Sequence, residues 1–313
     1  MLINPSPRKA RAVLESPASG CQKTRAGAIL RRMPSRREFL HASIAAAAGL
    51  AATRLLASAR RSLGAQLYTV RQDAERDLST VLEAIRKIGY TKVETYWNIY
   101  GHPAAELRRM INDHGLKVPS GHFDYDGLES KIDYAKTLGV EYVICPMLPE
   151  NMWFTLDGYK QAADQFNTWG EKIHQAGMQF GFHNHNYEFR RFGDTTGFET
   201  MMKRCDPKLV CIEMDCYWIA QAGEHPLQMF QQYGNRIQVL HLKDRKPGFP
   251  TTQVKDTPAE HFTEVGAGTI HWSEILAAAE KNGVKHLFVE RDSGDLPAME
   301  SLRISFQNLQ TIG

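Results

Sequence analysis

Two histidines and a glutamate directly follow an apolar segment in the stretch QFGFHNHNYEF, residues 179–189. His183 and His185 are two positions apart, so a strand would direct both side chains to the same side. Imidazoles and a carboxylate at the end of a buried strand are costly to desolvate unless they have partners. The alternative is a hydrogen-bonded core histidine beside an exposed rim. We favour a functional cluster that includes Glu188, because later apolar segments end in residues of the same kind.

Three later apolar segments end in residues that can also ligate metals, namely Asp215, His241 and Glu290. Each has a plainer explanation: Asp215 could cap a helix, and His241 could be a core residue. Glu290 could likewise pair with Arg291 on the surface. With a histidine of the first stretch, however, they form a mixed nitrogen and oxygen donor set. Such a set suits Mn²⁺, Co²⁺, Zn²⁺, Fe²⁺ or Mg²⁺ without selecting among them.

A metal in such a site would bind two neighbouring oxygens of a substrate and polarise a carbonyl as a Lewis acid. The C–H bond beside that carbonyl becomes acidic, so a nearby base can move its proton. The donor set therefore predicts isomerisation, epimerisation or β-elimination.

Short apolar segments alternate with longer amphipathic ones from residue 62 onward. The predicted strands are 63–70, 92–96, 117–123, 141–147, a fifth from 179, 209–215, 237–242 and 285–289. The predicted helices are 77–88, 103–114, 128–138, 159–175, 196–204, 226–233, 272–282 and 299–311.

Strict alternation of eight strands and eight helices predicts an α/β fold, a single-domain (β/α)₈ TIM barrel over residues 60–313. The alternative is a doubly wound open sheet, which usually carries a glycine-rich phosphate loop after an early strand. No such loop follows segments 63–70 or 92–96. In a barrel the carboxyl ends of all strands share one mouth, so the metal-binding residue types would converge there.

Further polar or aromatic residues at predicted strand ends would face the same mouth. We expect Glu94, His122, Trp218 and Arg291 to contact the substrate. The face of Trp218 would pack against the C–H face of a sugar, and packing at the rim is the alternative. The glycines of VGAGTIHW, residues 265–272, either let the backbone approach a ligand or serve a loop that needs positive φ.

The N-terminal residues differ in composition from the rest of the chain. Residues 1–59 hold ten Lys and Arg but two acidic residues, which leaves 28 basic and 33 acidic residues in the remainder. A nucleic-acid partner is therefore not indicated. Paired arginines in SRREFL (35–40) precede an Ala-rich apolar run (42–52) and the sequence ASA (57–59).

This order is that of a charged region, an apolar region and a small-residue cleavage site, and it resembles a twin-arginine export signal. An amphipathic helix and a membrane anchor are the alternatives. The apolar run is short for a stable membrane span, and Arg54 interrupts it. We predict that residues 1–59 are a disordered extension plus an export signal, with Met33 as a candidate start. The twin-arginine machinery would then be a partner, and the location would be periplasmic.

Four cysteines follow the predicted leader, and none has CxxC spacing. Their even number permits disulfides without requiring them. Cys145 and Cys211 lie in apolar segments, which favours buried thiols over ligands or nucleophiles.

Five motifs in the order HNHNYEF, EMDCYW, HLKD, VGAGTIHW and VERD resemble the xylose isomerase-like TIM barrel superfamily, in its sugar phosphate isomerase/epimerase branch. The resemblance covers about residues 62–313. In the epimerases a divalent metal is held by Glu, Asp, His and Glu at the ends of strands five to eight. Asp215, His241 and Glu290 match three of these positions, whereas the first falls on His183. Either His183 ligates directly, or Glu188 supplies the oxygen ligand.

The dehydratases of the same superfamily have a histidine two residues after the first ligand and a lysine two residues after the metal-bound histidine. His185 and Lys243 occupy these positions. The resemblance implies that His185 and Glu188 handle protons and that Lys243 stabilises negative charge. A salt bridge between Lys243 and Asp244 is the alternative.

The sequence as a whole predicts a metal-dependent isomerase or epimerase of a small sugar. Export favours a free or oxidised sugar over a phosphorylated one. A lyase or hydratase of 3-keto-glycosides is the alternative reaction, and a non-catalytic periplasmic sugar-binding barrel is the alternative class. The sequence leaves open which sugar is bound, which metal, and whether the protein forms a homo-oligomer.

Overall fold

The computed structural model describes residues 62–254 and 258–312. Eight parallel strands close into a barrel in the order β1-β12-β9-β8-β5-β4-β3-β2. Their bounds are β1 (Leu63–Gln66), β2 (Lys92–Thr95), β3 (Lys117–His122), β4 (Tyr142–Cys145), β5 (Gln179–His183), β8 (Val210–Asp215), β9 (Ile237–Leu242) and β12 (His286–Val289). The predicted single-domain (β/α)₈ TIM barrel is therefore confirmed.

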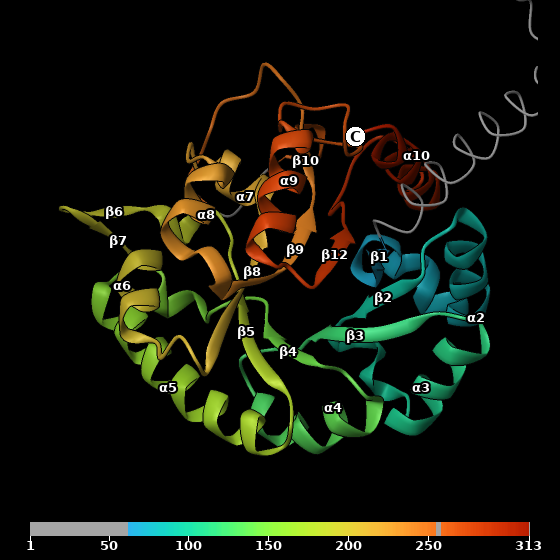
Figure 1. Cartoon of the computed structure of the whole chain (residues 1–313), viewed down its shortest axis with the longest axis horizontal. Helices are drawn as coiled ribbons and strands as arrows, with labels where there is room; N and C mark the ends of the chain where they lie inside the picture. Colours follow the sequence, from blue (N-terminus) through green and yellow to red (C-terminus); the bar gives the residue numbers. More distant parts are fainter. Residues whose placement is uncertain (1–61, 255–257, 313) are drawn as a thin grey trace, which may run out of the picture. The chain divides into compact units, whose positions relative to one another are not determined.

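A helix follows each barrel strand and lies on the outside of the barrel (Figure 1). These helices are α2 (Arg71–Ile88), α3 (Ala104–Asp113), α4 (Ile132–Leu138), α5 (Leu156–Gln175), α6 (Gly197–Arg204), α8 (Pro226–Tyr233), α9 (Trp272–Asn282) and α10 (Ala298–Thr311). Two small antiparallel sheets and an added helix lie outside this alternation. They are β6 (Arg191–Phe192) with β7 (Thr195–Thr196), β10 (Asp244–Arg245) with β11 (Phe262–Thr263), and α7 (Cys216–Gln221).

Side-chain caps explain why several helices begin where they do. The Thr155 hydroxyl accepts the Gly158 N–H at the start of α5. Thr196 and Glu199 form a reciprocal capping box at the start of α6. Each cap satisfies a backbone donor that has no partner within the helix, and this fixes the first turn.

The first predicted strand and helix differ from the structure at their junction. The strand ends at Gln66, and a 3₁₀ turn (Leu67–Val70) follows because the Gln66 side chain accepts the Tyr68 N–H. The predicted helix start, Asp77, is a non-helical residue inside α2 with φ −157°. Its carboxylate accepts the Thr80 N–H and hydroxyl, so a residue with the signature of an N-cap begins the second part of a kinked helix.

The barrel interior is apolar in its lower part and ionisable above it. Its apolar layer consists of Tyr142, Ile144, Cys211, Val239 and Phe288. Side chains alternate along a strand, so residues two and four positions after this layer also face the interior. On β8 these interior residues are Glu213 and Asp215, and on β9 the first of them is His241. The strands thereby carry charged groups into the upper half of a closed barrel.

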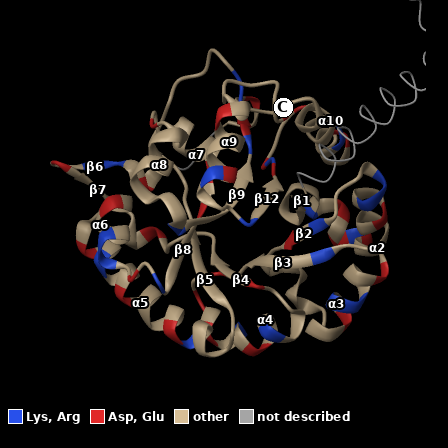
Figure 2. Cartoon of the chain, in the orientation of Figure 1, with Lys and Arg blue, Asp and Glu red and all other residues tan. Residues whose placement is uncertain are grey.

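The outer helices carry both signs of charge, with Lys and Arg interspersed among Asp and Glu along α2 to α6 (Figure 2). None of the helices in residues 62–254 and 258–312 is both long and apolar enough to span a lipid bilayer. The four cysteines in these residues are buried and free, as predicted for Cys145 and Cys211. The predicted export signal and the candidate start at Met33 lie outside the described residues.

Candidate metal centre

Four side chains at the ends of four strands meet at the mouth of the barrel. They are His183 on β5, Asp215 on β8, His241 on β9 and Glu290 directly after β12, and we call them the upper set. One ligand atom of each lies within 4.8 Å of the others, and all four side chains are buried. His241 Nδ1 lies 2.8 Å from Glu290 Oε2, and His183 Nε2 lies 3.8 Å from Asp215 Oδ2. The structure thus brings together the four residues that the sequence suggested as metal ligands.

The two carboxylate oxygens of Asp215 have different partners. Oδ1 accepts the Trp218 N–H at 2.8 Å and caps α7, as the alternative sequence interpretation expected. Oδ2 is buried and accepts no hydrogen bond within the described residues, although Lys243 Nζ lies 3.1 Å away. This oxygen is paired with the ammonium group of Lys243, and it also faces His183 Nε2 and His241 Nδ1 at 3.8 and 3.9 Å. With two imidazoles and a second carboxylate, it completes a donor set that fits a divalent metal.

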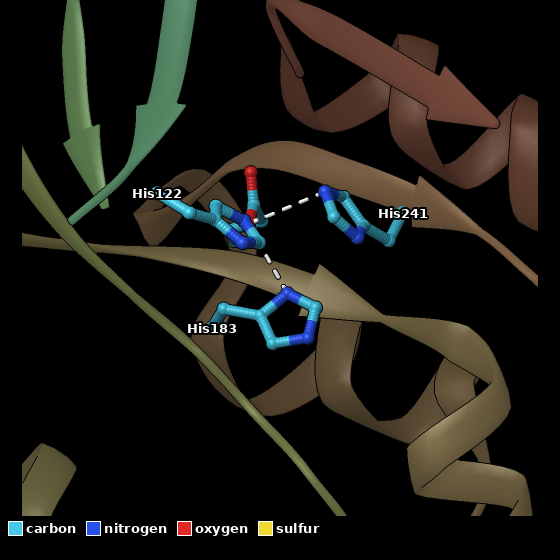
Figure 3. A group of neighbouring side chains, drawn as sticks. His122, His183 and His241 are labelled. Atoms are coloured by element: carbon cyan, nitrogen blue, oxygen red, sulfur yellow. Dashed lines mark hydrogen bonds and ion pairs between the residues drawn. The ribbon is translucent and has the colours of Figure 1, made fainter. Parts of the chain in front are cut away.

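A second group lies beneath the upper set and shares its two histidines. It consists of His122, His183, Glu213 and His241, whose ligand atoms also lie within 4.8 Å of one another. Figure 3 shows the three histidines of this group pointing toward one another. Glu213 Oε2 lies 2.6 Å from His122 Nε2 and 3.1 Å from His183 Nδ1.

Glu94 completes this buried layer from β2. Its Oε2 lies 2.5 Å from His241 Nε2 and accepts a hydrogen bond from Gln66 Nε2 at 2.7 Å. We call Glu94, His122 and Glu213 the lower layer. Glu213 is absent from the site predicted from sequence, although it stands two positions before Asp215 and therefore faces the same side of β8.

Lys243 is buried among three carboxylates. Its Nζ lies 2.7 Å from Glu290, 2.8 Å from Asp292 and 3.1 Å from Asp215. Burial alone would lower the pKa of Lys243, but these carboxylates raise it well above its usual value. Lys243 is therefore a cation.

The alternative salt bridge between Lys243 and Asp244 is wrong. Consecutive residues of an extended chain point to opposite sides, and Asp244 faces the loop of the VGAGTIHW motif. Its carboxylate accepts the N–H groups of Gly266, Gly268 and Trp272 Nε1 at 2.9, 3.1 and 2.7 Å. A Cβ at Gly268 would lie 2.2 Å from Asp244 Oδ1, so the glycine permits this close approach. Gly266 adopts φ +87°, as the loop alternative expected, and Gly268 makes room for an internal carboxylate instead of a ligand.

Burial and neighbouring charges shift the pKa values of the upper set in different directions. Burial would lower the pKa of His241, but Glu213, Glu290 and Glu94 raise it well above its usual value. Burial, with nearby His241, lowers the pKa of His183 well below its usual value. Burial also raises the pKa of Asp215 to about 6, against the influence of Lys243. Burial therefore favours the neutral imidazole, the form that ligates metals, in His183, whereas the neighbouring carboxylates favour the imidazolium form of His241.

A cavity of about 670 Å³ opens above the upper set. Five of the predicted site residues besides Glu290 line it, namely His122, His183, His185, Trp218 and Lys243. It is also lined by residues that the sequence prediction did not include, among them Tyr68, Arg71, Trp97, Asp124, Phe262 and Asp292.

Trp218 joins the two candidate catalytic groups. The His185 and Trp218 ring centroids are 5.1 Å apart, and Lys243 Nζ lies 5.3 Å from a Trp218 ring centroid.

Five predicted residues do not line this cavity, and two of them, Asp215 and His241, belong to the upper set. Glu94 belongs to the lower layer. Arg291 Nη1 donates to Glu264 at 2.6 Å and borders a separate cavity of about 430 Å³. Glu188 is fully buried, and its Oε2 accepts the His185 backbone N–H at 2.8 Å. Glu188 therefore contacts the segment that carries His185, and the structure does not bring its carboxylate to the upper set.

Replacing Glu188 with glutamine is expected to change how stability depends on pH. Burial raises the pKa of Glu188 to about 8. Between pH 5 and 8 the folded protein thus holds a proton that the unfolded chain releases, and stability falls as pH rises, by roughly 1.4 kcal/mol per pH unit. Glu188→Gln removes this pH dependence, and the glutamine side chain can still accept the His185 N–H. Urea unfolding at several pH values from 5 to 8.5 should show that the free energy of unfolding falls less steeply with rising pH in the variant than in the wild type. The same pH dependence in both proteins would contradict the prediction.

Comparisons with known proteins agree with this architecture. The family model described as xylose isomerase-like TIM barrel matches residues 82–310. An inosose dehydratase from Lacticaseibacillus casei is 27% identical over 226 residues, covering 62% of this chain and 75% of the relative. An inosose dehydratase from Clostridium beijerinckii is 28% identical over 216 residues, covering 59% and 72%.

Solved structures give the same picture. A sugar phosphate isomerase/epimerase from Parabacteroides distasonis superimposes with a TM-score of 0.67 at 26% identity, over 79% of this chain and 96% of that one. The IolI protein with a bound zinc atom superimposes with a TM-score of 0.64, over 80% and 98% of the chains. Its identity of 16% supports the fold alone.

Proposed function

Because the chain belongs to the xylose isomerase-like TIM barrel family, we propose that it is a metal-dependent enzyme that removes a proton beside the carbonyl of a small carbohydrate. One observation carries this proposal. The upper set gathers its four ligand atoms within 4.8 Å, and His185 and Lys243 line the same cavity. A metal-binding donor set, a base and a fixed cation around one cavity are the parts that such a reaction needs.

The upper set would hold the metal through His183, Asp215, His241 and Glu290. When bound there, a divalent metal would polarise the substrate carbonyl as a Lewis acid. The cavity of about 670 Å³ suits a small carbohydrate. Trp97 and Trp218 line it and would pack against the C–H faces of a sugar ring.

His185 is the residue we assign as the base. It lines the cavity, and its ring stacks on Tyr187 with centroids 5.6 Å apart. Lys243 is held as a cation on the same wall, where its ammonium group would stabilise negative charge that develops on a substrate oxygen. Glu188 would act indirectly, by positioning the backbone of His185.

We favour β-elimination as the outcome. His185 takes the proton beside the carbonyl, the electrons of that C–H bond form a C=C bond, and the C–O bond at the next carbon breaks. The imidazolium of His185 returns the proton to the departing oxygen, which leaves as water or, from a glycoside, as an alcohol. Two observations favour this reaction: β5 ends in His183 instead of a carboxylate, and the two sequence relatives above are inosose dehydratases.

Isomerisation or epimerisation is the second candidate. It would use the same proton abstraction and then return the proton to carbon. The likeness to a sugar phosphate isomerase/epimerase at 26% identity favours it. The two reactions differ only in whether the C–O bond breaks before the proton returns.

Metal content and proton exchange test the proposal. The purified protein is expected to contain or take up one divalent metal. It would then be incubated in D₂O with ketoses and with 3-keto-glycosides. Loss of water or of the aglycone supports elimination, whereas deuterium in recovered sugar supports isomerisation or epimerisation. A protein that takes up no divalent metal would instead fit a non-catalytic sugar-binding barrel.

We also propose that the protein is exported to the periplasm, because residues 35–59 resemble a twin-arginine signal. Cell fractionation is expected to find the protein in the periplasmic fraction. Replacing Arg36 and Arg37 with lysine should retain it in the cytoplasm. Equal export of the variant and the wild type would contradict the proposal.

A further inference from the structure

We propose that Glu213 is a positioning residue that supplies, one layer below the metal, the negative charge that a histidine ligand on β5 lacks. This inference rests on the proposed function, because it takes the upper set as the place of the metal. Glu213, which the sequence prediction omitted, would prepare the upper set to bind a cation.

The two ring nitrogens of His183 face different layers. Nε2 lies 3.8 Å from Asp215 Oδ2 in the upper set, and Nδ1 lies 3.1 Å from Glu213 Oε2. An imidazole that ligates a metal binds through the lone pair of one ring nitrogen and keeps its proton on the other. Since a carboxylate can only accept, Nδ1 holds the proton and Nε2 is left with the lone pair. Glu213 thereby selects the tautomer that can ligate a metal in the upper set.

His241 on the neighbouring strand also rests on the lower layer, but both of its ring nitrogens lie beside carboxylates, so Nδ1 must give up a proton before it can ligate a metal. Nδ1 lies 2.8 Å from Glu290 Oε2, and Nε2 lies 2.5 Å from Glu94 Oε2. Both histidines of the upper set therefore rest on a buried carboxylate. Glu213 Oε2 also lies 3.3 Å from His241 Nε2, so Glu94 and Glu213 together support both histidines from below.

The charge balance explains why Glu213 matters more than an ordinary partner. The upper set contains two carboxylates, Asp215 and Glu290, and two neutral ligands once the histidines bind through lone pairs. An N–H donated to a carboxylate makes the imidazole more basic and a stronger ligand. His183 with Glu213 thus acts as a unit that presents part of a negative charge to the upper set. The pair would replace a carboxylate ligand on β5, with its negative charge on Glu213 in the lower layer instead of on the ligand itself.

The second group offers a competing position for the metal around the lower layer, because the ligand atoms of His122, His183, Glu213 and His241 also converge. In that case the metal would use the opposite ring nitrogens, and neither Asp215 nor Glu290 would be among its ligands. Among the carboxylates of the two groups it is Glu290 that lines the cavity, so a metal bound to Glu290 would lie nearer to a substrate there. We therefore place the metal in the upper set and give Glu213 the supporting role.

A double-mutant cycle with Co²⁺ tests this inference, because the visible absorption of bound Co²⁺ reports on its ligands. Metal-free protein would be titrated with Co²⁺ alone, for the wild type, Glu213→Gln, His183→Glu and the double variant. Glu213→Gln is expected to weaken Co²⁺ binding about 10- to 100-fold. The His183→Glu variant should bind weakly too, because its new carboxylate would face Glu213. The double variant should bind more tightly than His183→Glu alone.

The control is Glu141→Gln. Glu141 Oε2 lies 3.5 Å from His286 Nε2, so it is another Glu–His pair, but it does not belong to the upper set or the lower layer. Its replacement should leave the affinity unchanged. Thermal unfolding of each metal-free variant would separate weaker binding from loss of the fold.

Three results would overturn the inference. They are an unchanged Co²⁺ affinity in a folded Glu213→Gln variant, losses that simply add in the double variant, or a greater loss in His122→Gln than in Asp215→Asn. The last would place the metal in the lower layer. A wild-type protein that binds no Co²⁺ would count against the proposed function itself, so the two failures are distinguishable.

Discussion

Replacing Lys243 with methionine is expected to lower turnover about 100- to 1,000-fold while the protein still binds a divalent metal. The magnitude is that of removing one preorganised group that stabilises developing negative charge. Lys243 Nζ is fixed by Asp292 at 2.8 Å, so its position does not depend only on the two carboxylates of the upper set. Methionine keeps much of the side-chain volume and removes the charge.

The same variant should be less stable without metal. Removing Lys243 leaves Asp215, Glu290 and Asp292 close together and without their shared cation, a change that typically costs about 3–5 kcal/mol. Added metal should recover part of this loss, because it neutralises two of the three. Turnover, metal content and thermal unfolding with and without metal check both parts. Lys281→Met, at an exposed position of α9, is the control, and full turnover in Lys243→Met would remove Lys243 from the mechanism.

Replacing His185 with alanine is expected to lower turnover about 100- to 10,000-fold and to leave metal bound. This range is the usual contribution of a general base. His185 lines the cavity but stands outside the upper set, so its loss should spare the donor set. Deuterium incorporation and elimination should fall together, because both begin with the same proton transfer.

His174→Ala is the matched control for His185→Ala, since His174 is exposed on α5. Metal content of each variant would be measured beside turnover. Loss of metal from His185→Ala would mean that His183 and His185 have exchanged roles. Unchanged turnover would place the base elsewhere on the cavity wall.

Hydrophobic periodicity was sufficient to predict the barrel. The bounds of β9, α8 and α9 agree with the expected segments, because a regular apolar spacing marks all three and a terminal glycine ends each of the two helices. The upper set was predictable for a related reason. Parallel strands bring their carboxyl ends to one mouth, so residues far apart in sequence can be grouped without knowing their distances.

The lower layer could be predicted only in part. Glu213 lies between two apolar residues of β8, and its role depends on which side chains of β3 and β5 lie opposite. That relation follows from strand register and barrel closure, which periodicity does not specify. The partners of Lys243 illustrate the same limit. Asp292 comes from the end of another strand, whereas the neighbouring Asp244 points away because of strand alternation.

Barrel closure between β1 and β12 has a consequence for how the protein folds. Leu63 pairs with Leu287, more than two hundred residues along the chain, and Glu290 directly follows the strand that closes the barrel. Until β12 is in place, β1 and β9 are open edges prone to pair with other chains, and such long-range closure is slow. The metal site is completed at that same step, so the free energy of metal binding favours the closed barrel over every open intermediate. A bound metal would thus stabilise the product of the last folding step.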